Sequence, residues 1–158
     1  MKKNLLIVLT TAILALGAGG GAAPQGEDAL KQATDTFMTR VTSDQAEQAL
    51  GDLVDHYWFD RSDITKTKAS FLNQLTPEMT KMEGSLGKAL PKQYEFVGTK
   101  RLGKSVVRLV YIQKFENFFA PWSFTFYKAK DEFRLAGINF GDSVEDDLKG
   151  FATTEPAK

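Results

Sequence analysis

Apolar side chains recur at helical spacing through the first part of the chain. Between residues 29 and 41 they form one stripe, made of Leu30, Ala33, Phe37, Met38 and Val41. Between residues 46 and 57 they form a second stripe, made of Ala46, Leu50, Leu53, Val54 and Tyr57. Offsets of three, four, seven and eight residues are typical of one buried helix face. Because only a few polar residues separate the two stripes, the pattern predicts an antiparallel helical hairpin.

A third helical segment follows between residues 64 and 90. Its apolar positions again share one face, and they are Phe71, Leu72, Leu75, Met79 and Met82. The sequence Thr76-Pro77-Glu78 interrupts it, because Thr is a good N-cap and Pro fits the first position of a new helix. We therefore expect either two short helices or one broken helix, ended by Pro91.

The periodicity changes to strict alternation between residues 93 and 142. Four runs, 93–101, 104–115, 120–128 and 131–140, are separated by short turns. Consecutive strands joined by short turns pair antiparallel, so the runs predict a four-stranded meander. The alternation changes phase near Ala136-Gly137, which indicates a bulge or bend in the last strand.

The register of this sheet can be predicted from the turns. We place Arg101 opposite Lys104, Phe115 opposite Phe118, and Lys128 opposite Asp131. One face then collects ten bulky side chains: Tyr94, Phe96, Val107, Leu109, Tyr111, Trp122, Phe124, Phe126, Phe133 and Leu135. Such a face needs a cover, and the amphipathic helices supply it. The predicted fold class is α+β, with an N-terminal helical hairpin and a third helical segment packed on a curled four-stranded antiparallel meander sheet.

The two ends of the chain differ from its middle. Lys2 and Lys3 precede a short apolar run and a Gly/Ala-rich stretch, the three parts of a bacterial signal peptide. The sequence therefore predicts a signal peptide over 1–23 with cleavage within residues 20–23, one domain over 24–150, and a polar tail over 151–158. The run is too short for a membrane helix. The chain contains no cysteine, which excludes disulfides and a lipid anchor on cysteine, so we expect a periplasmic or secreted protein.

Charge and residue types exclude several classes of function. Without residues 1–23 the chain carries 18 basic and 20 acidic residues, which is no footprint for nucleic acid or an anionic membrane. Cysteine nucleophiles are impossible, and no G-x-S-x-G motif accompanies the one histidine, His56. The acidic clusters lack the spacing and the glycine of a calcium loop, so we expect neither a metal site nor a cofactor.

Two groups of residues are candidates for binding. Tyr94 and Tyr111 lie opposite each other in the predicted register, and an amphipathic pocket would be lined by His56, Trp58, Tyr94, Tyr111 and Trp122. A filled core with tyrosine hydroxyls at its rim is the alternative. The other sheet face is too apolar for a fully hydrated surface, through Val97, Val106, Arg108, Val110, Ile112 and Tyr127. It would pair with a second copy of the chain, or be covered by the C-terminal tail with Phe151 as a lid.

The stretch "WSFTFYKAKDEFRLAGINF" and the preceding helical hairpin resemble the nuclear-transport-factor-2-like superfamily of cone-shaped α+β proteins. The resemblance implies a curled sheet around helices, in a superfamily that includes isomerases, dehydratases, transport adaptors and small exported binding domains. Its enzymes use a tyrosine–carboxylic acid or histidine–aspartate pair, and neither motif is matched here. The fold alone therefore leaves the function open.

Three functions are compatible with the sequence. The first is an exported, non-catalytic module that binds a small apolar or amphipathic ligand or a protein. The second is an isomerase-like or dehydratase-like enzyme using Tyr94, Tyr111 and His56. The third is a structural component of an envelope assembly, for which the apolar outer sheet face is the indication.

Overall fold

The computed structural model describes residues 26–59 and 62–141 of the chain. The predicted signal peptide and the predicted tail lie outside the described residues. Three helices come first: α1 (Glu27–Val41), α2 (Ala46–Tyr57) and α3 (Ile64–Leu86). They precede four strands: β1 (Ala89–Leu102), β2 (Val106–Phe115), β3 (Phe119–Ala129) and β4 (Glu132–Phe140). The strands form one antiparallel sheet in the order β1-β2-β3-β4, so the predicted α+β meander is confirmed.

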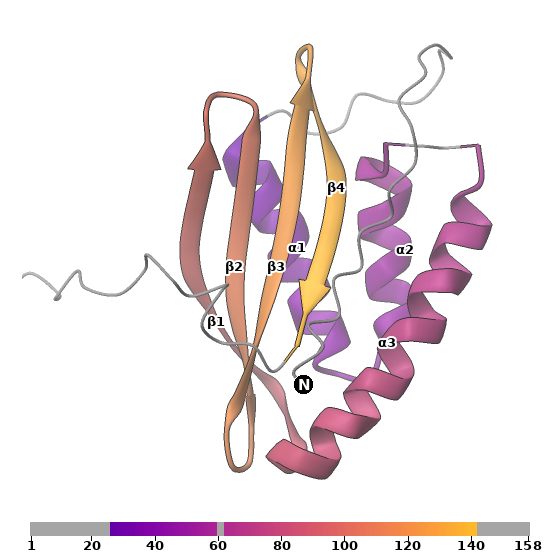
Figure 1. Cartoon of the computed structure of the whole chain (residues 1–158), viewed down its shortest axis with the longest axis vertical. Helices are drawn as coiled ribbons and strands as arrows, with labels where there is room; N and C mark the ends of the chain where they lie inside the picture. The colour runs from indigo at the N-terminus through magenta and orange to yellow at the C-terminus, as the bar shows by residue number, and fades with distance from the viewer. Residues whose placement is uncertain (1–25, 60–61, 142–158) are drawn as a thin grey trace, which may run out of the picture.

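The helices lie on one side of the sheet (Figure 1). α1 contacts β1 and β2, and α2 contacts α1 and β4, which makes these two helices the antiparallel hairpin that covers the sheet. α3 packs on α2 rather than across the middle of the sheet. It still reaches the common core through Phe71, Leu75 and Met82. The opposite side of the sheet, hereafter the outer face, carries no described helix.

α3 runs without a break through Pro77, so both expected forms, two short helices and one broken helix, are wrong. Proline removes one backbone N–H from the helix ladder, and the carbonyl that loses its partner belongs to Asn73, four residues earlier. Pro77 and Asn73 are both exposed, where water can replace the missing bond. The helix also ends earlier than predicted, at Leu86, and β1 already begins at Ala89.

The predicted alternation of the sheet is confirmed through its centre. Leu109 lies directly opposite Phe124, and both are buried under the helices. The predicted hairpin between Phe115 and Phe118 is also correct, since the Phe115 N–H donates to the Phe118 carbonyl at 2.8 Å. Of the ten predicted inner-face residues, the buried ones are Val107, Leu109, Tyr111, Trp122, Phe124, Phe126 and Leu135. Tyr94 and Phe133 pack against this core while partly exposed, and Phe96 is 36% exposed.

The two outer hairpins depart from the predicted register. Lys128 pairs with Phe133 instead of Asp131, a shift of two that keeps each side chain on its face. Ala136 is then an extra residue between Leu135 and Gly137, so the predicted bulge in the last strand is confirmed. It brings Ile138 and Phe140 into the core, where each is 3% exposed.

β1 is shifted further against β2. Its turn spans three residues, 103–105, with Gly103 at φ 61°, and Arg101 pairs with Val107 rather than Lys104. A bulge lies between Phe96 and Gly98, so Val97 has no partner in β2. Beyond the bulge the parity is reversed, which brings Arg101 to the helical side, where it forms an ion pair with Glu27 of α1.

Candidate functional site

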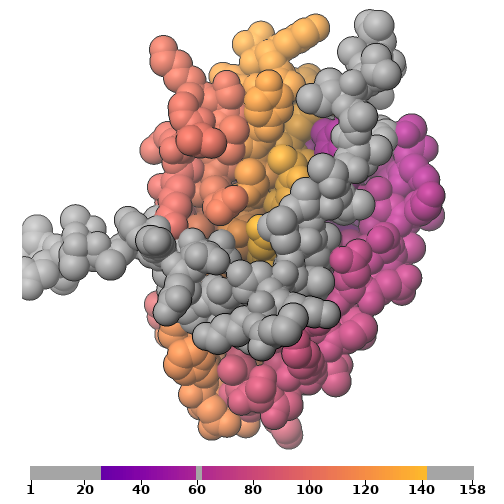
Figure 2. Space-filling view, in the orientation of Figure 1, coloured from indigo at the N-terminus to yellow at the C-terminus, as the bar shows by residue number. Residues whose placement is uncertain are grey.

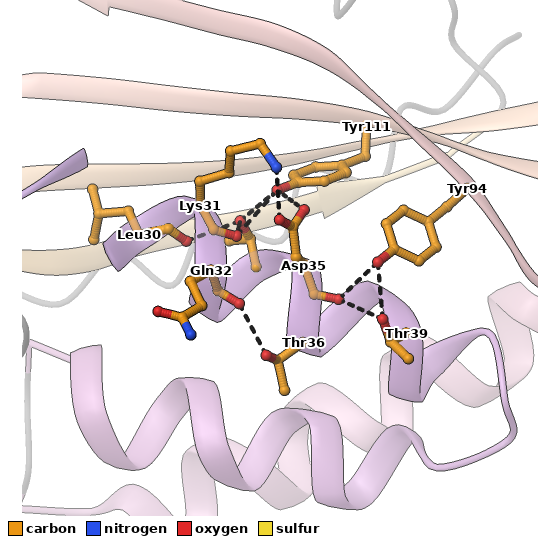
Figure 3. A network of polar contacts seen from close by, with 9 residues as sticks. Leu30, Lys31, Gln32, Asp35, Thr36, Thr39, Tyr94 and Tyr111 are labelled. Atoms are coloured by element: carbon orange, nitrogen blue, oxygen red, sulfur yellow. Dashed lines mark hydrogen bonds and ion pairs between the residues drawn. The ribbon is translucent and has the colours of Figure 1, made fainter. Parts of the chain in front are cut away.

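A polar network joins the buried side of β2 to α1 (Figure 3). The Tyr111 hydroxyl lies 2.7 Å from the Thr34 hydroxyl and donates to Asp35 Oδ1 at 2.9 Å. Thr34 and Tyr111 are both fully buried, and Thr34 lies in a buried stripe of α1 that is otherwise apolar. A buried hydroxyl must find partners inside the fold, and these two find each other. The network therefore fixes the rotation of α1 about its axis relative to β2.

The same network continues toward the exposed edge strand β1. Tyr94 donates its hydroxyl proton to the Asp35 backbone carbonyl at 3.2 Å, and its oxygen lies 2.8 Å from the Thr39 hydroxyl. Lys31 pairs with the Asp35 carboxylate at 2.6 Å, and its Nζ lies 4.8 Å from the centre of the Phe96 ring. The exposed end of the network is thus an ion pair that leans on an aromatic ring.

Tyr111 is held in its neutral form. Burial raises the pKa of its hydroxyl far above the usual value near 10, and the neighbouring Asp35 carboxylate adds to the rise. Burial raises the pKa of Tyr57 as well. A tyrosine with a raised pKa and a carboxylate acceptor is a hydrogen-bond donor and no base. The network is suited to anchoring a helix rather than to removing a proton from a substrate.

Replacing Tyr111 with Phe is expected to lower the free energy of unfolding by about 1–3 kcal/mol at pH 7, because a hydrogen bond to a charged carboxylate is lost inside the fold. The pH dependence should change too. The stabilisation from a raised tyrosine pKa is complete below pH 10, and it is lost above pH 10 as the unfolded chain ionises. Urea titrations at pH 7 and at several values above 10 measure both effects.

The decisive comparison is how steeply the free energy of unfolding falls with pH above 10 in the parent chain and in Tyr111→Phe. Tyr111 contributes up to about 1.4 kcal/mol of lost stability per pH unit above 10, and Tyr111→Phe should remove that share while Tyr57 keeps its own. Tyr127→Phe serves as control at pH 7, because Tyr127 is 48% exposed. An unchanged slope in Tyr111→Phe would contradict the buried, neutral state of this side chain.

The residues predicted to line a pocket fall into separate places. Tyr94 and Tyr111 are neighbours, with ring centres 6.1 Å apart, and Trp122 lies directly opposite Tyr111 in β3. His56 is exposed on α2, and its Nδ1 lies 2.7 Å from the Asp52 carbonyl one turn earlier. Trp58 is buried where the chain leaves α2 and bridges to Leu135 at the edge of β4. The sequence grouped all five residues, and the structure brings three of them together.

The predicted pairing of Tyr94 with Tyr111 is wrong. Tyr94 lies opposite Gln113, and Phe96 is the direct partner of Tyr111. The cause lies in the β1–β2 turn, which moves β1 by three residues along β2, and in the bulge at Val97, which takes one residue back and leaves a shift of two at Tyr94. Because the shift is even, Tyr94 stays on the helical face and still reaches Tyr111 diagonally.

Sequence reasoning missed Gln113. Its Oε1 accepts the indole N–H of Trp122 at 2.9 Å, while its Nε2 is buried with no hydrogen-bond partner. Gln113 is fully buried beside Ala120, its small partner in β3. The signal for it was a glutamine at an inward position of an alternating strand. An unused buried donor is a site for a water molecule or for a polar atom of a ligand.

The predicted partner surface lies on the outer face. By register the outward residues include Val106, Arg108, Val110, Ile112 and Tyr127, while Val97 is the bulged residue. Arg108 is tied to this face, since its Nε donates to Thr125 Oγ1 at 3.1 Å across the strands. Tyr127 is half exposed, whereas Val110 and Ser123 in the middle row are completely buried. Polar side chains continue that row, with Ser123 directly opposite Asn139.

The described residues include neither a group of metal ligands nor a helix suited to span a membrane. Within 26–59 and 62–141, no three histidine, cysteine, aspartate or glutamate side chains are grouped closely enough to hold a metal ion. None of the described helices combines the length and the apolar character that crossing a bilayer requires.

Comparison with known proteins gives no relative. No family model matches the chain, and neither a curated protein nor a solved structure matches it. The resemblance to the nuclear-transport-factor-2-like superfamily therefore stays a prediction, and the argument for function depends on the surfaces themselves.

Proposed function

We propose that the chain is an exported, non-catalytic interaction module that binds protein through its outer face, and that its first partner is a second copy of itself. The helical face of the sheet is occupied by the core, with Tyr111, Trp122, Phe124 and Phe126 all fully buried. The outer face carries partly exposed apolar side chains, Val106 and Ile112, together with the half-exposed Tyr127. Export is part of the proposal and is supported by the pattern of residues 1–23.

The observation that carries this proposal is a pair of unused polar atoms on the outer face. Ser123 Oγ and Asn139 Oδ1 are both buried and neither has a hydrogen-bond partner. The two residues pair directly across β3 and β4, beside Val110 of β2. An unpaired buried polar group costs about 1–3 kcal/mol, so it is expected where another molecule completes the bonding. Both atoms lie in the row of Val110, and they support the proposal that a polar group of a partner approaches this row.

A second copy is the simplest partner for this surface. Symmetric dimers present the same patch twice, and sheets commonly pack face to face through alternate side chains. Ile112 and Val106 flank Val110 on β2 and are partly exposed, so two outer faces would bury further apolar area on contact. The dimer also agrees with the predicted resemblance, since its fold leaves one sheet face outside the cone.

Sedimentation velocity across a concentration series tests the proposal on a chain that begins at residue 24, which keeps every described residue. We expect dimers to form between about 1 μM and 1 mM. Ile112→Lys and Tyr127→Lys should each weaken association by about tenfold or more, because each places a charge in the contact. Phe118→Lys, at a 53% exposed position on the β2–β3 turn, is the matched control. A monomer throughout, or equal effects of all three changes, would remove the dimer.

Small-ligand binding is the second candidate, and Gln113 favours it. Its unused Nε2 donor lies in the same region as Tyr94, Tyr111 and Trp122. A ligand with a polar atom that accepts from Gln113 would raise the melting temperature, by an amount that grows with the logarithm of the ligand concentration above its Kd. A thermal-shift screen with Gln113→Leu as control separates specific binding at this position from binding elsewhere.

A further inference from the structure

The tips of two hairpins lie side by side at one end of the sheet (Figure 1). The β1–β2 turn spans residues 103–105, and the β3–β4 turn is formed by Lys130 and Asp131. The Lys128 N–H donates to the Ser105 carbonyl at 2.6 Å, which ties the first tip to the beginning of the second. The two tips therefore form one surface, hereafter the hairpin end, made of residues 100–105 and 128–132.

The hairpin end presents an exposed apolar side chain among basic ones. Leu102 is 76% exposed, while Phe118 and Tyr127, the next large apolar side chains by exposure, are 53% and 48% exposed. Leucine at such a position contributes nothing to the core. Lysines flank it, with Lys100 and Lys104 on the first tip and Lys128 and Lys130 on the second. Figure 2 shows the side chains of both tips projecting from this end of the molecule.

The local charge of the hairpin end is positive although the chain as a whole is nearly neutral. Residues 100–105 and 128–132 contain five basic and two acidic residues. One of the five, Arg101, is compensated by Glu27 of α1, and one of the two acids, Glu132, is engaged with Arg134. Lys128 lies over the Phe133 ring at 5.7 Å from its centre. Lys104, Lys128 and Lys130 therefore stand beside Asp131 at the tips.

Local charge decides what such an end attracts. At physiological ionic strength charges are screened within about 8 Å, so acidic residues elsewhere on the molecule have little influence on this end. The near-neutral total charge gave no indication of binding to an anionic membrane. It is a sum over the whole molecule, however, and does not show that the hairpin end is locally positive. Lysine side chains also reach out with apolar stems and a charged head, which fits an interface between hydrocarbon and water.

We propose that the hairpin end docks on an anionic lipid bilayer. Leu102 enters the headgroup region while Lys104, Lys128 and Lys130 lie over the lipid phosphates. A single apolar side chain with a basic ring gives weak, reversible attachment, which needs both components. An acidic protein would also satisfy the lysines, but a leucine that is 76% exposed at the end of a hairpin strand fits penetration into a soft surface better than contact with a folded one. This inference uses none of the atoms on which the proposed dimer depends.

Vesicle sedimentation tests the proposal on the chain that begins at residue 24. Vesicles in which roughly a third of the lipid is phosphatidylglycerol should bind the protein, and vesicles of phosphatidylcholine alone should not. Binding should fall as salt is raised. Lys104→Glu and Lys130→Glu should each weaken binding by about fivefold or more, since each lysine near an anionic surface contributes about 1 kcal/mol. Leu102→Ser should weaken binding to anionic vesicles at every salt concentration.

Phe118→Ser is the matched control for Leu102→Ser. Phe118 is also an exposed apolar residue on a turn, but the β2–β3 turn lies at the opposite end of the sheet. It should leave vesicle binding unchanged. All four changes are at exposed positions, and unchanged melting temperatures will show that each variant is folded. The proposal is overturned by absence of binding at low salt, by equal losses in Phe118→Ser and Leu102→Ser, or by vesicle binding that does not change in Leu102→Ser, which would leave charge alone and assign the surface to acidic protein.

Discussion

Replacing Phe124 with Ala is expected to lower the free energy of unfolding by about 3–5 kcal/mol, the largest loss predicted for any single change considered for this chain. Phe124 is fully buried at the centre of the sheet. Its ring makes edge-to-face contacts with Phe37 of α1, at 5.1 Å between centres, and with Tyr111 of β2, at 5.7 Å. Alanine would remove the apolar area and these ring contacts, and would leave a cavity that surrounding helices and strands cannot close.

Urea unfolding followed by circular dichroism measures this loss, provided that the slope against urea stays the same in the variant. Phe118→Ala is the matched control, because it removes the same ring from a side chain that is 53% exposed. Its cost should stay within about 1 kcal/mol. Comparable losses in both variants would mean that burial in the sheet centre is not what stabilises the fold.

The sequence could predict this core because alternation in strands carries the information directly. Leu109 and Phe124 lie in the interior of their runs of alternating residues, and an even register error leaves both on the same face. The bulge at Ala136 could also be predicted, since Ile138 and Phe140 are out of phase with Leu135. When bulky residues on either side of a point in a strand differ in parity, a bulge at that point can be inferred from the sequence.

The bulge in β1 had no such signal. Val97 is apolar, and the residues after it are Gly98, Thr99 and Lys100, so no bulky side chain marks the reversal of parity. Edge strands are bordered on one side by solvent, which relaxes the requirement for alternation. The length of the β1–β2 turn was equally hidden, because Gly103 fits a positive φ in a turn of two residues or of three.

The candidate site was harder to predict than the fold. The sequence indicated Tyr111 and Trp122 as inward residues of adjacent strands, and they are. It could not give the partner of the Tyr111 hydroxyl. The apolar periodicity of a helix and of a strand marks their buried faces, but it does not show which helix residue lies against which strand residue. One clue was present. Thr34 stands between Leu30 and Met38 at four-residue spacing, and a hydroxyl in an apolar stripe calls for a buried partner.

The two proposed surfaces follow from how this fold uses its residues. The inner face of the sheet is committed to the core, and the Tyr111 network holds α1 on it, so chemistry there would have to displace packed aromatic rings. Binding is therefore expected on surfaces whose side chains are not needed for core packing. The outer face has unused buried oxygens at Ser123 and Asn139, and the hairpin end has an unburied leucine.

Replacing Gly87 with Ala is expected to cost about 2–3 kcal/mol, because the backbone and the surroundings both oppose a side chain. Gly87 ends α3 at φ 84° and ψ −179°, a region that is essentially restricted to glycine and costs other residues about 1–3 kcal/mol. A Cβ there would lie 2.9 Å from Glu116 Cβ and 2.8 Å from Asn117 Nδ2. The β2–β3 turn cannot retreat freely, since Asn117 N–H donates to the Leu86 carbonyl at 2.9 Å.

Gly84 provides the matched control, with an effect of opposite sign. It lies one turn earlier in α3, with no atom within 4 Å of a Cβ placed on it. Gly84→Ala should therefore raise the free energy of unfolding by about 0.5–1 kcal/mol, because alanine restricts the unfolded chain and favours the helix. Urea unfolding of both variants measures the difference of about 3 kcal/mol. If the two alanines changed stability in the same direction, α3 could not end on Gly87 against the β2–β3 turn as the structure has it.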